Sequence, residues 1–120
     1  MTTDMLYLTS CNMSVCTAVA ERIAPTLELF DESFPSAAFE DIELCYRVRQ
    51  PECAVSVRLA HSAVVFHDYH TSLWGLVTQF FRYGRSEHLM TTKHPGYLTA
   101  LAASGPCHLS RRTLETVTPA

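Results

Sequence analysis

The sequence predicts an α/β fold built from a few short strands and three helices. Residues 54–59 alternate apolar and polar side chains, as a half-buried strand does. Residues 40–50 and 73–90 instead repeat apolar side chains at the three- and four-residue spacing of a helix face. The chain offers at most three short strands and three helices, too few for an α/β sheet covered on both faces. We therefore expect the chain to be the second half of a larger fold.

The composition is that of one small folded domain. Of the 120 residues 48% are hydrophobic and the formal net charge is −3, so the chain can bury a core and has no electrostatic reason to bind nucleic acid. No apolar run approaches the roughly 20 residues that span a bilayer, and the first residues lack the pattern of a signal peptide. The 5 cysteines include no Cys-x-x-Cys pair, which favours reduced thiols and a cytoplasmic location.

In the first half of the chain we expect a strand, a helix and a loop before the helix at residues 40–50. Residues 5–8 have the apolar run of a short buried strand, and residues 14–24 have helical spacing that ends before Pro25. Residues 27–34 are expected to form the loop. One face of the helix at residues 40–50 then carries four side chains, namely Asp41, Leu44, Cys45 and Val48.

In the second half, a β-rich run at residues 63–66 follows the strand at residues 54–59. Thr71 or Ser72 can cap the helix over residues 73–90. We expect this helix to pack against the core through an apolar stripe, which comprises Leu73, Val77, Phe80, Phe81 and Gly84.

Carboxylates are concentrated between residues 30 and 44. Glu40 and Asp41 open a predicted helix, whose positive end favours the charged form of both side chains. Asp41 lies on the apolar face, so we expect it to point inward or into a cleft, where a carboxylate needs a partner or a task. The alternative is simple charge stabilisation of the helix start, which we adopt for Glu43.

Histidines follow the strand-like runs of the second half. His67 stands at a predicted strand end beside Asp68, a place where ligands bind in α/β sheets. Together with distant carboxylates it could bind a cation that accepts mixed nitrogen and oxygen ligands, such as Mn²⁺. The alternative is a histidine that only hydrogen-bonds to the surrounding structure. His61 and His70 complete a spacing that matches no zinc-protease motif.

The helix at residues 73–90 carries a second polar group of interest. Gln79, Arg82 and Tyr83 occupy neighbouring helix positions, so an amide, a guanidinium and a phenol can converge on one edge. An arginine there suits a diphosphate or carboxylate partner. The alternative is a solvated polar edge beside an aromatic pair that faces the core.

Five motifs occur in an order and spacing typical of one enzyme family. They are Asn12-Met13-Ser14, Phe30-Asp31-Glu32, Glu40-Asp41-Ile42-Glu43-Leu44 with Arg47, Val65-Phe66-His67, and Gln79-Phe80-Phe81-Arg82-Tyr83. Over about residues 8–97 the chain thereby resembles the C-terminal half of family 2 glycosyltransferases, which have the GT-A fold. The later Tyr83-Gly84-Arg85-Ser86 and His94-Pro95 are similar to mycofactocin-type and galactosyltransferase-like members.

The resemblance implies the C-terminal portion of a GT-A domain at residues 1–97, without its nucleotide-binding N-terminal half. Residues 98–120 would be a C-terminal extension, partly disordered. The implied reaction is inverting transfer of a sugar from a nucleotide-diphosphate donor to an acceptor hydroxyl. The donor and a glycan, lipid-linked or small-molecule acceptor are the implied partners, with a location in the cytoplasm or peripherally on the cytoplasmic face of a membrane.

The resemblance also assigns roles to residues. Asp41 matches the catalytic base and Glu40 would position the acceptor or that base. His67 matches a metal ligand for Mn²⁺ or Mg²⁺, but only once a missing Asp-x-Asp half completes the site. The implied acceptor and substrate contacts are Asn12, Phe30, Asp31, Glu32, Gln79, Arg82 and Tyr83.

The chain departs from the family pattern at several positions. Leu29 and Phe39 stand where relatives commonly carry glycines, and Tyr83 stands where processive members carry tryptophan. No Asp-x-Asp occurs in the chain. We therefore expect these residues alone to be inactive, as a truncated product or a fragment of a longer transferase.

Two other classes of protein remain open. The chain can be a non-catalytic binding domain that uses an exposed stripe of Trp74, Phe80 and Phe81, or a metal-binding module built on its histidines. The helix at residues 73–90 also has the composition of a helix that lies on a membrane surface, although packing is the expected arrangement.

Overall fold

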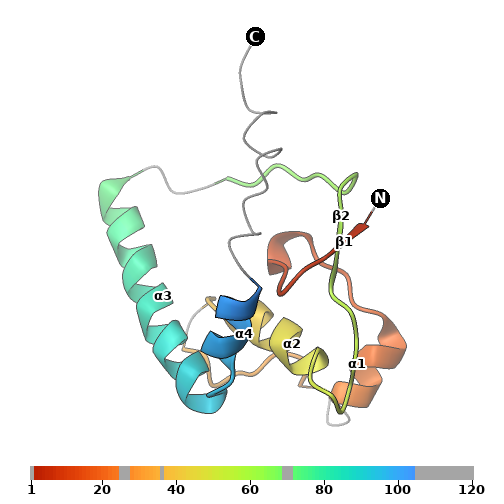
Figure 1. Ribbon diagram of the computed structural model, residues 1–120. Coiled ribbons are helices and arrows are strands. Elements are labelled where there is room, and N and C mark those ends of the chain that lie inside the picture. Colours follow the sequence, from red (N-terminus) through yellow and green to blue (C-terminus); the bar gives the residue numbers. More distant parts are fainter. Residues whose placement is uncertain (1, 25–27, 36, 69–71, 105–120) are drawn as a thin grey trace.

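The computed structural model describes residues 2–24, 28–35, 37–68 and 72–104 (Figure 1). In chain order its elements are β1 (Thr2–Asp4), the 3-10 turn η1 (Ser10–Asn12), α1 (Thr17–Ile23), α2 (Glu40–Val48), β2 (Arg58–Ala60), α3 (Leu73–Lys93) and α4 (Tyr97–Ala103). None of the described helices is long and apolar enough to cross a membrane.

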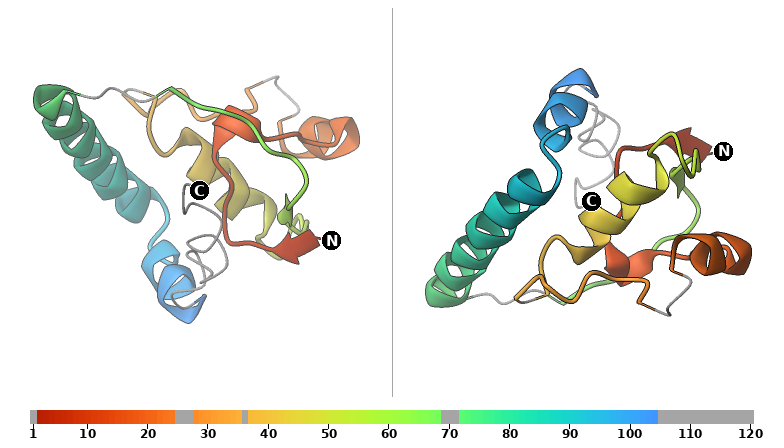
Figure 2. Two further views of the ribbon diagram at one scale, coloured as in Figure 1. Left: turned by 90° about the horizontal axis from the view of Figure 1, so that it is seen from above. Right: turned by 90° about the horizontal axis from the view of Figure 1, so that it is seen from below.

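Helix α2 lies at the centre of the molecule, with α1 on one side and α3 and α4 on the other (Figure 1 and Figure 2). Its first apolar face carries Leu44, Cys45 and Val48, which are buried with Val57. Partly buried side chains from the N-terminal segment, α1 and the chain before β2 pack against this group. The helical spacing therefore predicted correctly which side of α2 faces this core.

A second apolar cluster packs on another side of α2. Phe34, Met90 and Tyr97 are buried there, and Tyr46 of α2 meets the Tyr97 ring edge-on with ring centres 6.0 Å apart. A Cβ atom added at Gly96 would stand 2.8 Å from the Tyr46 hydroxyl oxygen. Because glycine has no side chain, the turn between α3 and α4 can approach Tyr46 this closely.

The Glu43 side chain connects α2 to two other segments. It is only 2% exposed and accepts hydrogen bonds from Arg47 Nε at 3.2 Å and Arg47 Nη2 at 3.0 Å. His94 Nε2, in the turn after α3, lies 3.0 Å from Glu43 Oε1, the same oxygen that accepts from Arg47 Nε. Arg47 Nη2 also donates to the Leu29 carbonyl oxygen at 2.8 Å. The expectation that Glu43 merely stabilises the helix start by its charge is therefore wrong, because buried charges need such partners.

The predicted strands are only partly present. β1 and β2 pair antiparallel with Thr3 opposite Leu59, and the Met5 N–H donates to the Val57 carbonyl oxygen at 2.7 Å. The strand expected at residues 5–8 is thus wrong, since the ladder lies on its N-terminal side. The strand expected at residues 54–59 reaches its ladder only at residues 58–60, although Val57 is buried and its neighbours are exposed as alternation predicts.

The strand expected at residues 63–66 is also wrong. This segment is irregular, and its apolar side chains Val64, Val65 and Phe66 are exposed. In the described part of the chain no strand pairs with it, so nothing there supplies the ladder that would make it a strand. The two-stranded antiparallel ladder neither establishes nor excludes part of a GT-A fold, and that fold class stays a prediction.

Among the helices, α2 and α3 lie close to their predicted ranges. The Ser72 hydroxyl accepts from the Gly75 N–H at 3.0 Å, as expected for a cap, whereas Thr71 lies outside the described residues. The first helix is shorter than residues 14–24, and α4 was not predicted at all. Helix α4 crosses the expected boundary between residues 97 and 98, and the expected disorder of the C-terminal tail beyond residue 104 lies outside the described residues.

We expect Glu43→Gln to destabilise the fold by about 3 kcal/mol, because the substitution leaves Arg47 and His94 beside a neutral partner in a buried setting. The free energy of unfolding in urea at pH 7 measures this. The control Glu87→Gln changes an exposed carboxylate of α3 and should stay within about 0.5 kcal/mol of the unsubstituted chain. Equal effects of the two substitutions would contradict the central role of Glu43.

Candidate functional site

A cleft of about 580 Å³ opens where the start of α2, the turn η1, the segment after β2 and the middle of α3 meet. It collects predicted site residues from three of these segments: Glu40 and Asp41, then His67, and finally Gln79, Arg82 and Tyr83. These side chains are far apart in the sequence, so the fold alone brings them to one cavity.

Asp41 is held rigidly at the edge of the cleft. Its Oδ2 accepts from the Ser10 N–H at 2.8 Å, and its Oδ1 accepts from the Ile42 N–H at 2.8 Å. Each carboxylate oxygen retains a second lone pair for another donor. The partly buried position on the cleft side of α2 agrees with the prediction that this carboxylate points into a cleft rather than into solvent.

The Cys45 thiol lies near Asp41, and its pKa reflects both the apolar core and the charge of that carboxylate. Burial raises the pKa of the Cys45 thiol, the hydrogen bond from the Leu8 N–H lowers it, and the nearby negative charge of Asp41 raises it again. Cys45 is therefore kept neutral against the apolar core. The other described cysteines, Cys11, Cys16 and Cys53, are also free thiols, and Cys107 lies outside the described residues.

The turn before α2 has an unusual backbone conformation. Phe39 has a φ of 72°, in the left-handed region that glycine adopts without cost. This is the position where the glycosyltransferase pattern has a glycine. The Phe39 ring packs edge-on against Tyr97 with centres 6.5 Å apart. The turn places Glu40 at the cleft, where its buried Oε2 has no hydrogen-bond partner among the described residues.

The histidine side of the cleft does not form a metal site by itself. His67 and Asp68 line the cavity, but the described residues contain no group of three or more His, Cys, Asp or Glu side chains that could hold a metal ion. His70 lies outside the described residues, so the module of His61, His67 and His70 is tested only in part. The residues that are described do not fit a complete metal centre.

Helix α3 presents its polar edge to the cleft. The Gln79 side-chain amide donates to the Tyr83 hydroxyl, and Arg82 lies beside this pair. The predicted convergence of amide, guanidinium and phenol on one edge is therefore present. The neighbouring Phe80 and Phe81 are exposed, so the expectation of a core-facing aromatic pair is wrong.

The Phe30-Asp31-Glu32 loop does not line the cleft. Phe30 and Asp31 line a separate hollow of about 330 Å³ together with Arg47, Lys93 and His94, and Glu32 is exposed. Asn12 is likewise not at the cleft, since its Nδ2 donates to the Ala63 carbonyl oxygen at 2.8 Å and so ties η1 to the segment after β2.

Asp31 is anchored by contacts that sequence reasoning missed. It forms an ion pair with Lys93 and accepts from the Ser33 hydroxyl at 2.6 Å and the Ser33 N–H at 3.0 Å. Burial alone would raise the pKa of Asp31, but the hydrogen bonds from Lys93 and Ser33 lower it to about 2. No local sequence pattern indicates this ion pair, because Lys93 follows Asp31 by 62 positions.

The cleft also includes residues that no motif indicated. Tyr7, Ser10 and Cys11 contribute from the N-terminal segment, and the Ser10 N–H reaches Asp41 across 31 positions of sequence. Asp68 also lines the cleft, but the sequence had already indicated it, because it follows His67 at a predicted strand end.

Comparisons with known proteins give no match for this chain. No protein-family model matches the chain, and searches of curated proteins and of solved structures give no match. The glycosyltransferase assignment accordingly rests on its motifs and stays a prediction.

Asp31→Asn should destabilise the chain at neutral pH, and this destabilisation should disappear in acid. The pKa of this carboxyl is near 3.8 when unperturbed and about 2 in the folded chain, so its ion pair stabilises the fold fully above pH 3.8. Protonation removes the contribution as the pH falls from 3.8 towards 2. Urea unfolding at stepped pH measures the difference between the two chains. With Glu32→Gln as the control, a difference that persists unchanged in acid would contradict the anchoring role of Asp31.

Proposed function

We propose that the cleft is the acceptor-side part of an inverting glycosyltransferase site. The observation that carries the proposal is that one cavity collects Glu40 and Asp41 from α2 together with Gln79, Arg82 and Tyr83 from α3. Charged side chains that are only solvated at a surface usually point into open solvent. Here the carboxylate of Asp41 and the guanidinium of Arg82 line the same cavity. The pairing suits a reaction in which a proton leaves one reactant and negative charge develops on another.

In this proposal Asp41 is the base. As the acceptor oxygen bonds to the anomeric carbon, the bond from that carbon to the donor diphosphate breaks, and the diphosphate leaves with the electron pair. The acceptor hydroxyl becomes acidic as its oxygen bonds to carbon, so a carboxylate is a strong enough base for late proton transfer. The N–H groups of Ser10 and Ile42 fix the orientation of the carboxylate and leave a lone pair on each oxygen to receive the proton.

Glu40 and the α3 edge would hold the reactants. Glu40 lines the cleft next to Asp41, and in this proposal its carboxylate positions the acceptor or Asp41. Arg82 offers the planar donor fork that recognises diphosphate, and the Gln79–Tyr83 hydrogen bond restrains the edge beside it. These roles need only the residues that line the cleft.

The donor half of the reaction is assigned to residues outside this chain. A nucleotide-binding half with Asp-x-Asp would supply the divalent cation, Mn²⁺ or Mg²⁺, which neutralises a leaving diphosphate. His67 lines the cleft and could contribute a ligand to such a metal centre, but the described residues do not complete one. The chain by itself is therefore proposed to bind parts of the substrates without turning them over.

Substitution of Asp41 tests the base. When the chain is mixed with a nucleotide-binding half that carries Asp-x-Asp, Asp41→Asn should reduce the rate of sugar transfer by about 100-fold or more, because the amide cannot take the proton. The amide oxygen can still accept one of the two backbone N–H groups, but its NH2 group faces the other, so the free energy of unfolding should fall by about 1 to 2 kcal/mol. Nucleoside diphosphate release measures transfer, and urea unfolding measures stability.

Glu87→Gln is the matched control for that assay, since it removes an exposed carboxylate of α3 outside the cleft. Its transfer rate should equal that of the unsubstituted chain. Full activity of Asp41→Asn would show that this carboxylate only caps α2, and the assignment of the base would be wrong.

Substitution of Arg82 tests the anion subsite in the chain alone. Inorganic pyrophosphate added to the labelled protein should shift the NMR signals of Gln79, Arg82 and Tyr83 first. Arg82→Gln should weaken this binding about tenfold or more, the cost of losing charge-assisted hydrogen bonds. Arg85→Gln, which changes a guanidinium outside the cleft on the same helix, should leave the affinity unchanged. Equal losses for both variants would mean non-specific attraction and no subsite.

A further inference from the structure

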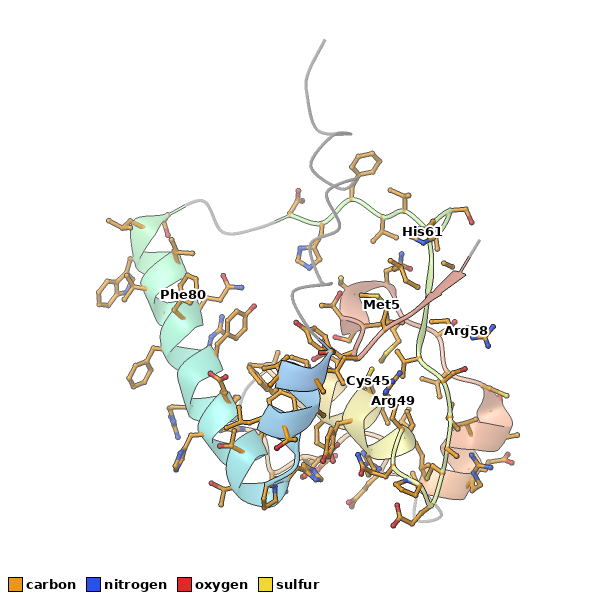
Figure 3. The ribbon with its side chains drawn as sticks, viewed as in Figure 1. Met5, Cys45, Arg49, Arg58, His61 and Phe80 are labelled. Atoms are coloured by element: carbon orange, nitrogen blue, oxygen red, sulfur yellow. The ribbon has the colours of Figure 1, made fainter. Side chains whose placement is uncertain are left out.

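The N-terminal segment at residues 5–10 runs alongside α2 and is bound to it by three side chains. Asp41, Cys45 and Arg49, the last directly after α2 and still in helical conformation, follow one another at intervals of four residues. Side chains at this spacing lie on one face of a helix. Figure 3 labels Cys45 and Arg49 together with Met5, the first residue of the segment.

Two of these side chains hold the start and the middle of the segment by its main chain. Arg49 Nη1 donates to the Met5 carbonyl oxygen at 2.6 Å. Cys45 Sγ accepts from the Leu8 N–H at 3.4 Å and donates to the Leu8 carbonyl oxygen at 3.8 Å. The segment therefore runs in the direction opposite to α2, and its position along the helix is fixed at two points.

The third contact is the one that holds Asp41 at the cleft. Asp41 Oδ2 accepts from the Ser10 N–H at 2.8 Å, and Ser10 follows Leu8 by only two residues. A hydrogen bond of this kind is lost when the two heavy atoms move to about 3.6 Å, so a small displacement of Leu8 is enough to break it. The side chains that hold the segment thus decide whether the Ser10 N–H meets Asp41.

The Cys45 thiol suits its place in the middle of this arrangement. Burial raises the pKa of the thiol, which is only 3% exposed, so the sulfur keeps its proton. A protonated thiol can donate and accept at once, as the two contacts with Leu8 require. Cys45 and Arg49 do not line the cleft themselves, so they act on it only through the segment.

We propose that Cys45 and Arg49 are positioning residues of the cleft, which hold the N-terminal segment where the Ser10 N–H orients Asp41. Neither residue belongs to the motifs that indicated the site in the sequence. Their effect on catalysis rests on the proposed function, in which Asp41 is the base, whereas the contact is a property of the chain alone. A misdirected base meets the acceptor hydroxyl in fewer productive geometries, so catalysis should suffer more than binding.

The Ser10 amide proton tests the contact by NMR of the full chain. The signal of a hydrogen-bonded amide proton changes little with temperature, and that of an amide exposed to water changes more. Cys45→Ala should raise the temperature dependence of the Ser10 signal towards that of an exposed amide. The Ile42 signal should stay as it is, because the Ile42 N–H donates to Asp41 Oδ1 within α2 itself. Cys45→Ser keeps a donor and an acceptor and should restore the Ser10 signal.

Val48→Ala separates this contact from a general loosening of the core. Val48 is buried in the same apolar cluster as Cys45, and the substitution removes packing but no side-chain hydrogen bond. The Ser10 signal should therefore keep its temperature dependence in this variant.

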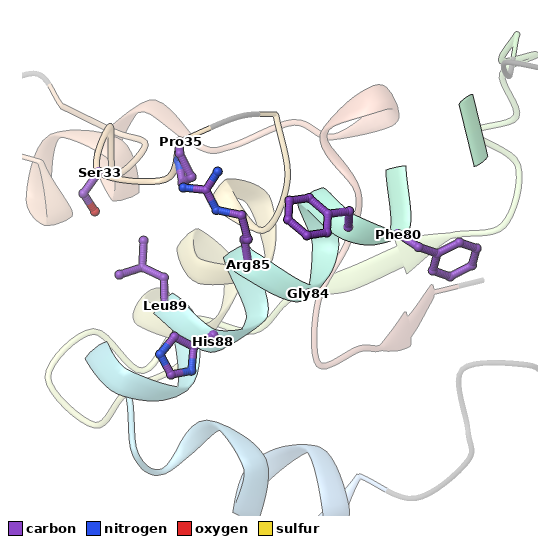
Figure 4. A pocket seen from close by; sticks show the side chains of 8 residues that line it. Ser33, Pro35, Phe80, Gly84, Arg85, His88 and Leu89 are labelled. Carbon is purple, nitrogen blue, oxygen red and sulfur yellow. The ribbon is translucent and has the colours of Figure 1, made fainter. Parts of the chain in front are cut away.

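Arg49→Met removes the other contact and retains most of the apolar length of the side chain. Its effect on the Ser10 signal should be smaller than that of Cys45→Ala, because it releases the segment five residues earlier. Arg85→Met is the matched control. Arg85 lies on α3 and lines a hollow beside Phe80 (Figure 4), and it does not line the cleft. This control should leave the Ser10 signal unchanged.

Sugar transfer measures the consequence for catalysis. When the chain is mixed with a nucleotide-binding half that carries Asp-x-Asp, Cys45→Ala should lower kcat about tenfold or more and raise the KM for the acceptor by a smaller factor. Val48→Ala and Arg85→Met should retain the kcat of the unsubstituted chain.

Three outcomes would overturn the proposal. One is an unchanged Ser10 signal in both Cys45→Ala and Arg49→Met. A second is an equal change in Cys45→Ala and Val48→Ala, which would mean general loosening. The third is an unchanged kcat of Cys45→Ala in an enzyme that Asp41→Asn inactivates. Full activity of Asp41→Asn would instead contradict the proposed sugar transfer, and the Ser10 signal would still decide whether Cys45 and Arg49 hold the segment.

Discussion

The buried carboxylate of Glu43 is the contact on which the arrangement of this chain depends. Through Arg47 it binds its own helix and the Leu29 carbonyl, and through His94 it binds the turn that joins α3 to α4. A carboxylate is costly to bury, so the three segments must stay in place to keep it paired. The two apolar clusters on the other sides of α2 then fill the space that this network defines.

The geometry of the cleft follows from this constraint. Because Glu43 fixes the rotation of α2, Asp41 is directed to another side of the first turn of this helix, where η1 supplies the Ser10 N–H. Because His94 is held at the end of α3, the polar edge with Gln79 and Arg82 is carried towards the same cavity. The site is thus positioned by a pair of groups that do not line the cleft.

The sequence predicted what local periodicity controls. It placed α2 and α3 near their observed bounds, put Asp41 on the same face as Leu44, and named Ser72 as one of two candidates for the cap of α3. It failed where partners are distant: Glu43 pairs with a residue 51 positions away, and Asp31 with one 62 positions away. The run at residues 63–66 has strand composition, but a strand also needs a neighbour, which no single stretch can reveal.

The exposed apolar residues of α3 show the same limit of prediction from sequence. They are Leu73, Trp74, Val77, Phe80 and Phe81. Periodicity established that α3 is amphipathic, and the usual inference is that the apolar side packs inward. What decides the matter is the far end of the helix, where the buried Ser86 and Met90 and the paired His94 set its rotation. Once that end is fixed, the aromatic residues nearer the start of the helix point outward. One helix therefore presents a polar edge to the cleft and an exposed apolar edge on another side.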